Sequence, residues 1–256
     1  MSILHKSWLT LETVDSTNNY AMALIQKRQI EHEIAIFAKE QTAGKGRRGK
    51  QWMSSKGENI ILSIAIPMQW LSISRQFEIS VAAALGCCDL LRNIILANLF
   101  IKWPNDIFIN DSKAGGILIE NVIKGKIWQW TVIGIGININ QENFGLENSA
   151  TSVKIITGKN FEVKPLAEKL YECVLKRVEQ LKQHHFTKML QEYNDSLYAR
   201  GKMVALQKQN IQFQTKITGV SASGELITQD AFERRFVFDE IIFKGLVQGQ
   251  QMNKFG

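Results

Sequence analysis

The stretch LFIKWPNDIFINDSKAGGILIENVIKGKIWQWTVIGIGINI, residues 99–139, contains four apolar runs separated by polar residues. The runs are rich in Ile and Val, and turns such as Asn110-Asp111-Ser112 separate them, which is typical of neighbouring β-strands. Three similar runs occur nearer the N-terminus. The predicted strands are therefore Trp8–Val14, Ile34–Ala38, Asn59–Ile66, Leu99–Trp103, Ile107–Ile109, Gly116–Val122 and Ile127–Ile139.

Helical patterns occupy other parts of the chain. Apolar residues at helical spacing predict a helix that begins at Thr17 and a long buried helix over Ser72–Asn98. An amphipathic helix is expected from Lys164, and a second over Phe186–Tyr198. Strands that are grouped together, with helices grouped elsewhere, predict an α+β fold in which a mixed β-sheet packs on helices.

The pattern changes again after Arg200-Gly201. Five short strand-like runs follow, with turns at Gly219 and Ser223-Gly224, and they predict a small β-barrel. We therefore expect two domains, a main domain over residues 1–199 and a small C-terminal domain over residues 200–256.

Composition excludes several classes of protein. The 256 residues are 45% hydrophobic and include 3 Pro, which indicates a globular chain rather than a disordered one. No apolar stretch is long enough to span a membrane, and residues 1–19 lack the apolar core of a signal peptide, so a cytoplasmic protein is expected. Cys87, Cys88, Cys173 and four scattered histidines have no metal-ligand spacing, so we expect neither disulfides nor a protein-bound metal.

A basic segment lies between Gln41 and Gly57. It contains five Lys or Arg residues and no acidic residue, in a chain of net charge +7. Residues 44–49, GKGRRG, match the GxGxxG pattern of dinucleotide-binding proteins, but loop-like residues follow them instead of a helix. The segment is better explained as a flexible loop whose glycines let the backbone approach a ligand while its cations neutralise phosphates. An exposed basic hairpin is the alternative.

The motif Lys102-Trp103-Pro104-Asn105-Asp106 follows a predicted strand. Because Pro104 ends strand pairing, the motif presents a cation, an amide and a carboxylate together at the edge of the sheet. Such a set suits a nucleotide with its magnesium ion, although a simple tight turn has the same pattern.

Three further segments pair glycine or a helix start with polar side chains. Lys113 stands beside Gly115-Gly116 at the beginning of a strand, where the backbone can approach a ligand closely. In residues 134–140, GIGININ, Asn138 is a buried amide that needs hydrogen-bond partners. Asp15-Ser16-Thr17-Asn18 precedes a helix and is expected to cap it, and the same groups can bind a polar ligand.

Taken in this order, the five segments resemble those of the biotin protein ligases. The matching residues are DSTN (15–18), QTAGKGRRGKQW (41–52), KWPND (102–106), KAGGILIE (113–120) and GIGINI (134–139). Lys45 departs from the family pattern, in which many members have Arg, so charge is kept but bidentate geometry is lost. The resemblance is clear over residues 10–140 and looser beyond, and it implies the class II synthetase-like biotin/lipoate ligase fold with an SH3-like C-terminal barrel.

The resemblance also implies an activity with ATP, Mg²⁺ and biotin. Such enzymes form biotinyl-5′-AMP and then transfer biotin to a lysine of a biotin carboxyl carrier protein or domain. Because both steps place negative charge on phosphate and carboxylate, fixed cations are the main catalytic requirement. Arg47 and Lys113 are expected to stabilise that charge, and Asp106 to contact the nucleotide and its magnesium or to activate the acceptor lysine.

The binding residues implied by the resemblance form two groups. The expected biotin-binding residues are Ser16, Thr17, Gln41, Gly44, Lys45, Arg47, Lys113 and Gly116. The expected ATP-binding residues are Arg47, Arg48, Lys50, Trp52, Lys102, Asn105 and Asn138. Arg48, Lys50 and Trp52 belong to a loop expected to order over the adenylate and exclude water.

Two other functions fit parts of the sequence. A lipoate–protein ligase would share the fold and the adenylation chemistry, and a nucleic-acid-binding module would explain the basic loop and the small barrel. The motifs favour biotin, with no nucleic-acid or membrane partner, and either a monomer or a homodimer. Because DSTN begins at residue 15, we expect a monofunctional ligase without an N-terminal DNA-binding domain.

Overall fold

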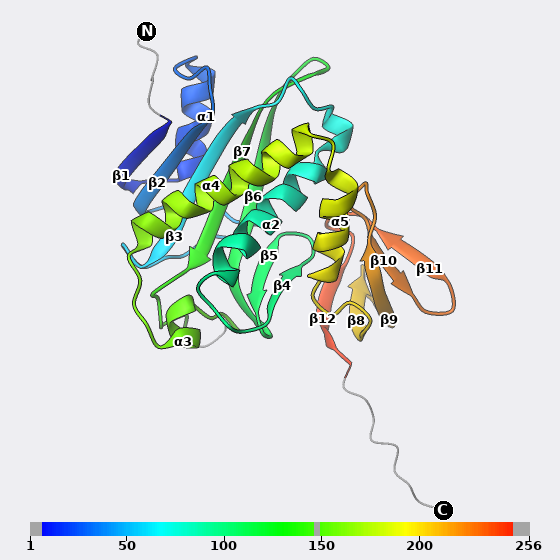
Figure 1. The fold of residues 1–256 in the computed structure, drawn as a ribbon. Helices are drawn as coiled ribbons and strands as arrows, with labels where there is room; N and C mark the ends of the chain where they lie inside the picture. Colours follow the sequence, from blue (N-terminus) through cyan, green and yellow to red (C-terminus); the bar gives the residue numbers. More distant parts are fainter. Residues whose placement is uncertain (1–6, 146–148, 248–256) are drawn as a thin grey trace, which may run out of the picture.

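The computed structural model describes residues 7–145 and 149–247, and a seven-stranded mixed sheet forms its centre (Figure 1). The strand order is β1-β2-β3-β7-β6-β5-β4, with β1 and β2 parallel and every other neighbouring pair antiparallel. The strands are β1 (Trp8–Val14), β2 (Ile34–Gln41), β3 (Asn59–Pro67), β4 (Leu99–Lys102), β5 (Asp106–Ile109), β6 (Ser112–Lys124) and β7 (Ile127–Asn138).

Helices cover both faces of this sheet. The α-helices are α1 (Thr17–Gln26), α2 (Phe77–Arg92), α3 (Val153–Thr157), α4 (Val163–Lys182) and α5 (Phe186–Asp195). Alternation along β2 separates the two faces: Ile34 and Ile36 pack with α1, whereas Ala35 and Phe37 belong to the core under α2 and α4. The predicted mixed sheet packed on helices is therefore confirmed.

Helix α2 is shorter than predicted. Residues 73–75 form a separate 3₁₀ turn, and the α-helix ends at Arg92 instead of continuing to Asn98. Leu96 is fully exposed, so the apolar run does not continue a buried helix face. The chain uses these residues to turn from α2 into β4. Helix α3 was not predicted. Ser152 caps its N-terminus by accepting from the backbone N–H of Ile155, and Gly158 ends it at a φ of +71°.

Five C-terminal strands form a second, antiparallel sheet of order β11-β10-β9-β8-β12. They are β8 (Met203–Lys208), β9 (Ile211–Val220), β10 (Leu226–Gln229), β11 (Glu233–Phe236) and β12 (Ile242–Leu246), and they lie beside α5 (Figure 1). Among the described residues β11 bonds only to β10 and β12 only to β8, so this SH3-like sheet is open where a closed barrel was expected. Residues 248–256 of the predicted C-terminal domain lie outside the described part.

The two sheets share one hydrophobic core. Val204, Leu206 and Phe236 of the C-terminal sheet are buried in the same cluster as the residues of α2 and α4. In the part of the chain that the structure describes, no helix combines the length and the apolar character needed to cross a membrane. The shared core brings the turn between β11 and β12 against the main sheet, where the candidate site lies.

Candidate active site

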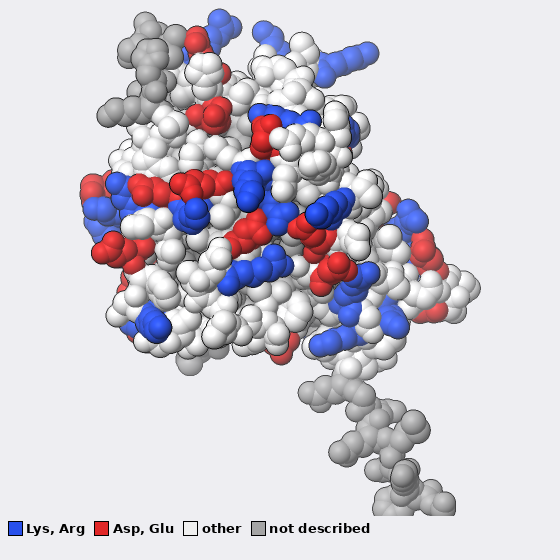
Figure 2. Space-filling view, in the orientation of Figure 1, with Lys and Arg blue, Asp and Glu red and all other residues white. Residues whose placement is uncertain are grey.

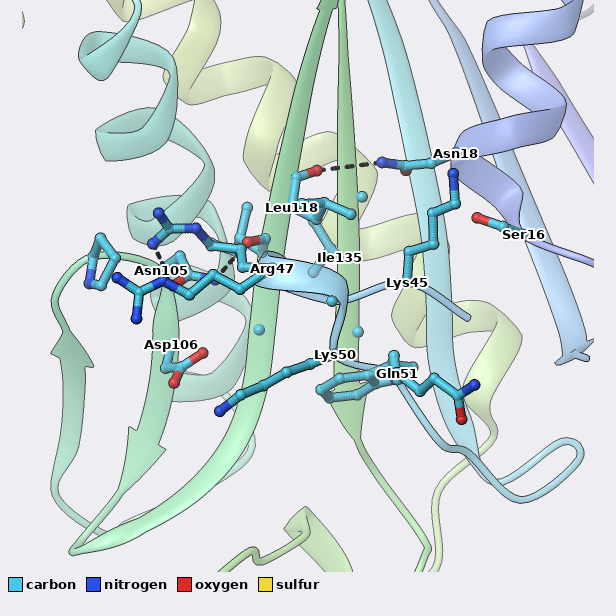
Figure 3. Close-up of a pocket in the computed structure, with 18 of the residues that line it drawn as sticks. Ser16, Asn18, Lys45, Arg47, Lys50, Gln51, Asn105, Asp106, Leu118 and Ile135 are labelled. Atoms are coloured by element: carbon cyan, nitrogen blue, oxygen red, sulfur yellow. Dashed lines mark hydrogen bonds between the residues drawn. The ribbon is translucent and has the colours of Figure 1, made fainter. Parts of the chain in front are cut away.

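A cavity of about 290 Å³ opens on the α1 face of the main sheet (Figure 3). Gly134 and Gly136 of β7 face it, since they follow Val132, which packs under α1, at the alternate positions of one strand. The N-terminus of α1, the β4–β5 hairpin, the loop after β2 and the 237–241 turn surround these strands. Segments from both sheets therefore build one site.

The inner end of the cavity is a polar floor, formed by Thr17, Asn18 and Gln41 with Ser63 beneath them. The backbone N–H of Thr17 donates to Gln41 Oε1 at 2.8 Å, and Ser63 Oγ lies 2.7 Å from Thr17 Oγ1 and 2.6 Å from Asn18 Oδ1. Thr17, Asn18 and Ser63 are all buried. These groups hold one another in place before any ligand arrives.

Asn18 connects the floor to the sheet. Its Nδ2 donates to Glu120 Oε2 at 2.7 Å, and it also reaches the carbonyl oxygen of Leu118 at 3.4 Å (Figure 3). Gly134 makes this position possible, because a Cβ there would lie 2.4 Å from Asn18 Oδ1. Glycine in this strand thus provides space for a polar side chain.

The second glycine of β7 receives an indole ring. A Cβ on Gly136 would lie 2.4 Å from Trp52 Cε2, so the ring of Trp52 lies directly on the backbone of β7. Trp52 Nε1 is buried and has no hydrogen-bond partner among the described residues. Together with Ile61 and Leu118, which lie beside Gly136 and Gly134 on the same face of the sheet, the indole makes an apolar middle section.

Cations line the outer part of the cavity. We call this set the basic rim; it consists of Lys45, Arg47, Arg48, Lys50 and Lys113. Lys45 Nζ donates to Asn19 Oδ1 at 2.6 Å, and Arg47 Nη1 donates to Asn105 Oδ1 at 3.3 Å (Figure 3). As expected, residues 44–49 open no helix; their only helical element is a 3₁₀ turn at Arg47–Gly49.

The KWPND motif is the turn of the β4–β5 hairpin. Lys102 pairs with Asp106 across the hairpin, and Asn105 donates from Nδ2 to the carbonyl oxygen of Ile117 at 2.8 Å. Asp106 Oδ1 accepts from Lys113 Nζ at 2.7 Å. Gly116 lies next to this ion pair. A Cβ at this position would be 3.5 Å from Asp106 Oδ1 and 3.6 Å from Lys113 Nζ, so a side chain here would stand beside both groups. The motif therefore supplies an amide and a carboxylate to the cavity.

Three residues expected at the site lie away from the cavity lining. Lys102 Nζ lies 4.7, 5.7 and 4.4 Å from the ring centroids of Phe108, Tyr198 and Phe243. Burial in this aromatic cage lowers the pKa of Lys102. Asn138 is buried and donates to the carbonyl oxygen of Thr151 at 3.0 Å. Gly44 closes the basic loop, where its carbonyl oxygen accepts from the N–H of Trp52 at 2.9 Å.

The other expected residues do meet in the cavity. They are Ser16, Thr17, Gln41, Lys45, Arg47, Arg48, Lys50, Trp52, Asn105, Asp106, Lys113 and Gly116. Sequence reasoning did not select Asn18, although it lies in the quoted DSTN motif and could have been found there. Asp239 and Ile241 also line the cavity and were missed, since neither belongs to any of the five motifs.

The charges of the site favour an anionic ligand. Among the described residues five cations line the cavity, against the two carboxylates Asp106 and Asp239. Nowhere in residues 7–145 and 149–247 do three His, Cys, Asp or Glu side chains gather as a metal site. On the face shown in Figure 2, acidic and basic side chains are interspersed along α4 rather than separated into a basic patch.

Comparisons with known proteins agree with this geometry. The chain is 26% identical over 234 residues to a bifunctional ligase/repressor of Bacillus spizizenii, covering 89% of this chain and 71% of that protein. It is 35% identical over 131 residues to a biotin–[acetyl-CoA-carboxylase] ligase of Paracoccus denitrificans, covering 50% of this chain and 53% of that one.

The fold has solved counterparts. The biotin protein ligase of Aquifex aeolicus in complex with biotin and ATP superposes with a TM-score of 0.78 at 23% identity, covering 94% of this chain and 99% of that one. The sequence model of the biotin/lipoate A/B protein ligase family matches residues 10–138, which span the polar floor, the basic loop and the KWPND hairpin. The chain therefore belongs to the biotin/lipoate A/B protein ligase family.

Proposed function

We propose that this protein is an ATP-dependent biotin–protein ligase. The observation that carries the proposal is a single cavity with a neutral polar floor at one end and a basic rim at the other. A ligand with an uncharged polar head, an apolar middle and a carboxylate tail matches this order of environments, and biotin has that form. The names of the relatives, biotin–[acetyl-CoA-carboxylase] ligase among them, support the same assignment.

In the first step the biotin carboxylate oxygen attacks the α-phosphorus of ATP. The bond from this phosphorus to the oxygen that bridges to the β-phosphate breaks, and pyrophosphate leaves with the electron pair of that bond. Negative charge grows on the phosphate oxygens as the two anions approach. Preorganised cations at that point lower the barrier, since they require no rearrangement when the charge develops.

Lys113 and Arg47 are the cations we assign to this charge. Lys113 is held at the start of β6 by its ion pair with Asp106, and Arg47 is held by Asn105. Lys45, Arg48 and Lys50 extend the positive potential along the basic loop. Trp52 closes the apolar middle section and restricts water there, which protects an acyl adenylate from hydrolysis.

In the second step a neutral lysine amine of the carrier attacks the acyl carbon of the adenylate. An amide bond forms, the bond from the acyl carbon to the phosphate oxygen breaks, AMP leaves, and the amine loses a proton. Asp106 lies beside Lys113 at the reacting end of the cavity and is the carboxylate we assign to orient the attacking amine. The acceptor is a lysine of a biotin carboxyl carrier protein or domain.

Magnesium enters with ATP as part of the substrate. Asp106 lines the cavity at its reacting end, and Mg²⁺ at such sites is held by one or two carboxylates together with phosphate oxygens. The donor set therefore fits a metal carried by the nucleotide. We also propose a boundary near residue 200, just before β8, between the ligase domain and the C-terminal domain.

An exchange assay tests the proposed function. Biotin should promote exchange of labelled pyrophosphate into ATP, and lipoate should not, since a lipoate–protein ligase is the alternative within this family. Addition of a carrier domain should then produce a biotinylated lysine, detected by mass spectrometry. Exchange with lipoate alone would contradict the proposal. Binding to nucleic acid that weakens steeply with salt, without any exchange activity, would favour the nucleic-acid alternative.

A further inference from the structure

Two arginines of the basic rim are paired with a carboxylate from a turn of the C-terminal sheet. Arg47 Nη2 donates to Asp239 Oδ1 at 3.0 Å, and Arg48 Nε donates to the same oxygen at 2.7 Å. Asp239 lies in the turn between β11 and β12, 192 residues from Arg47. Two guanidinium groups that converge on one oxygen are arranged as they would be around a phosphate oxygen.

The turn that carries Asp239 is firmly held. The ring of Phe238 stacks on Trp103 at 5.5 Å between centroids, and the guanidinium of Arg47 lies 5.3 Å from the centre of the same ring. Glu240 accepts from the N–H of Val237 at 3.1 Å and pairs with Lys208. The contacts to Trp103 and Lys208 join the turn to the main sheet and to β8, separately from the pairing of Asp239 with the basic loop.

The backbone at Asp239 is unusual for a residue with a side chain. Its φ is +69°, in the left-handed region that favours glycine and that costs other residues some stability. Aspartate and asparagine are among the residues with side chains that adopt this region most often, so the conformation permits an aspartate without requiring its charge. What the aspartate adds is a negative charge, and the groups it contacts are Arg47 and Arg48.

We propose that Asp239 is an internal counter-ion for Arg47 and Arg48, which the phosphates of the bound nucleotide displace. The inference rests on the proposed function, because the competing anion is the nucleotide of the ligase. In the free protein the carboxylate holds the basic loop against the C-terminal sheet. When phosphates bind, the arginines transfer to them and the contact between loop and sheet opens. The C-terminal sheet thereby lowers nucleotide affinity and responds to occupancy of the site.

Asp239→Asn tests the proposal, because the amide keeps the shape of the side chain and loses its charge. With biotin present, titration calorimetry should show a non-hydrolysable ATP analogue and inorganic pyrophosphate binding roughly three- to tenfold more tightly to the variant, as expected for loss of an exposed ion pair with two partners. Asp239→Gly should behave similarly, since it also relieves the backbone. Asp195→Asn is the matched control: Asp195 pairs with Arg200 at 2.6 Å outside the cavity, so its loss should leave both affinities unchanged.

Limited trypsin digestion without ligand gives a second readout. Cleavage after Arg47 and Arg48 should be faster in Asp239→Asn than in the parental protein, because the loop is no longer held. If Asp239→Asn is cleaved at the parental rate and binds pyrophosphate no more tightly than the parental protein does, the counter-ion proposal is wrong. If pyrophosphate binding tightens as expected but no protein forms biotinyl adenylate, the counter-ion stands and the proposed ligase function fails.

Discussion

The polar floor and the basic rim differ in how their side chains are held. Three of the four floor residues, Thr17, Asn18 and Ser63, are buried, and they are bonded to one another. Rim residues are partly exposed, and the partners of Arg47 and Arg48 include a carboxylate of the other sheet. A rigid floor recognises the shape of a neutral group without rearranging, whereas a rim held by exposed ion pairs can exchange one anion for another at small cost.

The largest expected effect is on the rim. Lys113→Ala should lower the rate of single-turnover adenylate formation by about 10²–10³, as removal of one oxyanion donor does, while ATP binding weakens much less. The charge that Lys113 meets is greatest in the transition state. Lys56→Ala is the control, because Lys56 is exposed and pairs with Glu40 outside the cavity. Adenylation of Lys113→Ala at the parental rate would remove Lys113 from the mechanism.

The next effect concerns the apolar section between floor and rim. Gly136→Ala places a methyl group where Trp52 now lies, and such overpacking costs about 1–3 kcal/mol. The free energy of unfolding should fall by this amount, and biotin affinity measured by calorimetry should fall as well, because the displaced indole enters the space of the ligand.

A double-mutant cycle with Trp52→Ala isolates the cause. If the clash with the indole is responsible, Gly136→Ala should cost little more once the indole is gone. Fully additive losses would show instead that Gly136 meets the ligand directly.

A substitution in the polar floor is expected to lower the stability of the protein more than its rate of adenylate formation. Ser63→Ala leaves the buried Asn18 Oδ1 without its hydroxyl donor, so the free energy of unfolding should fall by about 1–2 kcal/mol in urea titrations. Ser72→Ala, at an exposed serine whose hydroxyl lies 3.0 Å from that of Ser74, should change it by less than about 0.5 kcal/mol. Equal effects of the two substitutions would contradict the rigid floor.

The smallest expected effect on the adenylation rate is that of Lys102, a cation that lies near the rim but does not line the cavity. Lys102→Met removes a cation that is near the rim but enclosed by aromatic rings, so it should slow adenylation far less than Lys113→Ala does. If Lys102→Met slows adenylate formation as much as Lys113→Ala does, Lys102 acts on the nucleotide after all.

Lys102 also predicts a pH dependence. Burial lowers its pKa below the ordinary value of 10.5, so the folded protein releases this proton at a lower pH than the unfolded chain does. Between the lowered pKa and 10.5 the unfolded chain binds more protons, and this residue makes the free energy of unfolding rise with pH. Urea titrations across the alkaline range should show that rise in the parental protein relative to Lys102→Met. Parallel curves for the two proteins would contradict it.

Much of the fold could be predicted because period and turn composition are local properties. The strand Trp8–Val14 and the start of α1 at Thr17 appear in the structure as predicted. The end of α2 was wrong because an apolar sequence does not show that Leu96 faces solvent, and α3 was missed because five residues make too little pattern.

The candidate site divides in the same way. The motif residues Ser16, Gln41, Arg47 and Lys113 were chosen from the sequence, and they line one cavity. Lys102 and Asn138 belong to the same motifs but turn toward Phe243 and Thr151, because a side chain's direction depends on what packs beside its strand. Ser63 belongs to none of the five motifs. The signal that could have found it is a hydroxyl in the middle of an otherwise apolar strand.

By itself, then, the sequence determined the strands of the main sheet, the positions of the longer helices and the motifs that carry charge. Spacing along the chain sets these features, and no distant contact is needed to recognise them. The tertiary structure alone decided that Asp239 of the C-terminal sheet meets Arg47 and Arg48, and that Phe243 covers Lys102. Contacts across nearly 200 residues depend on sheet order and on a core shared by two sheets, and neither leaves a periodic trace in the amino-acid sequence.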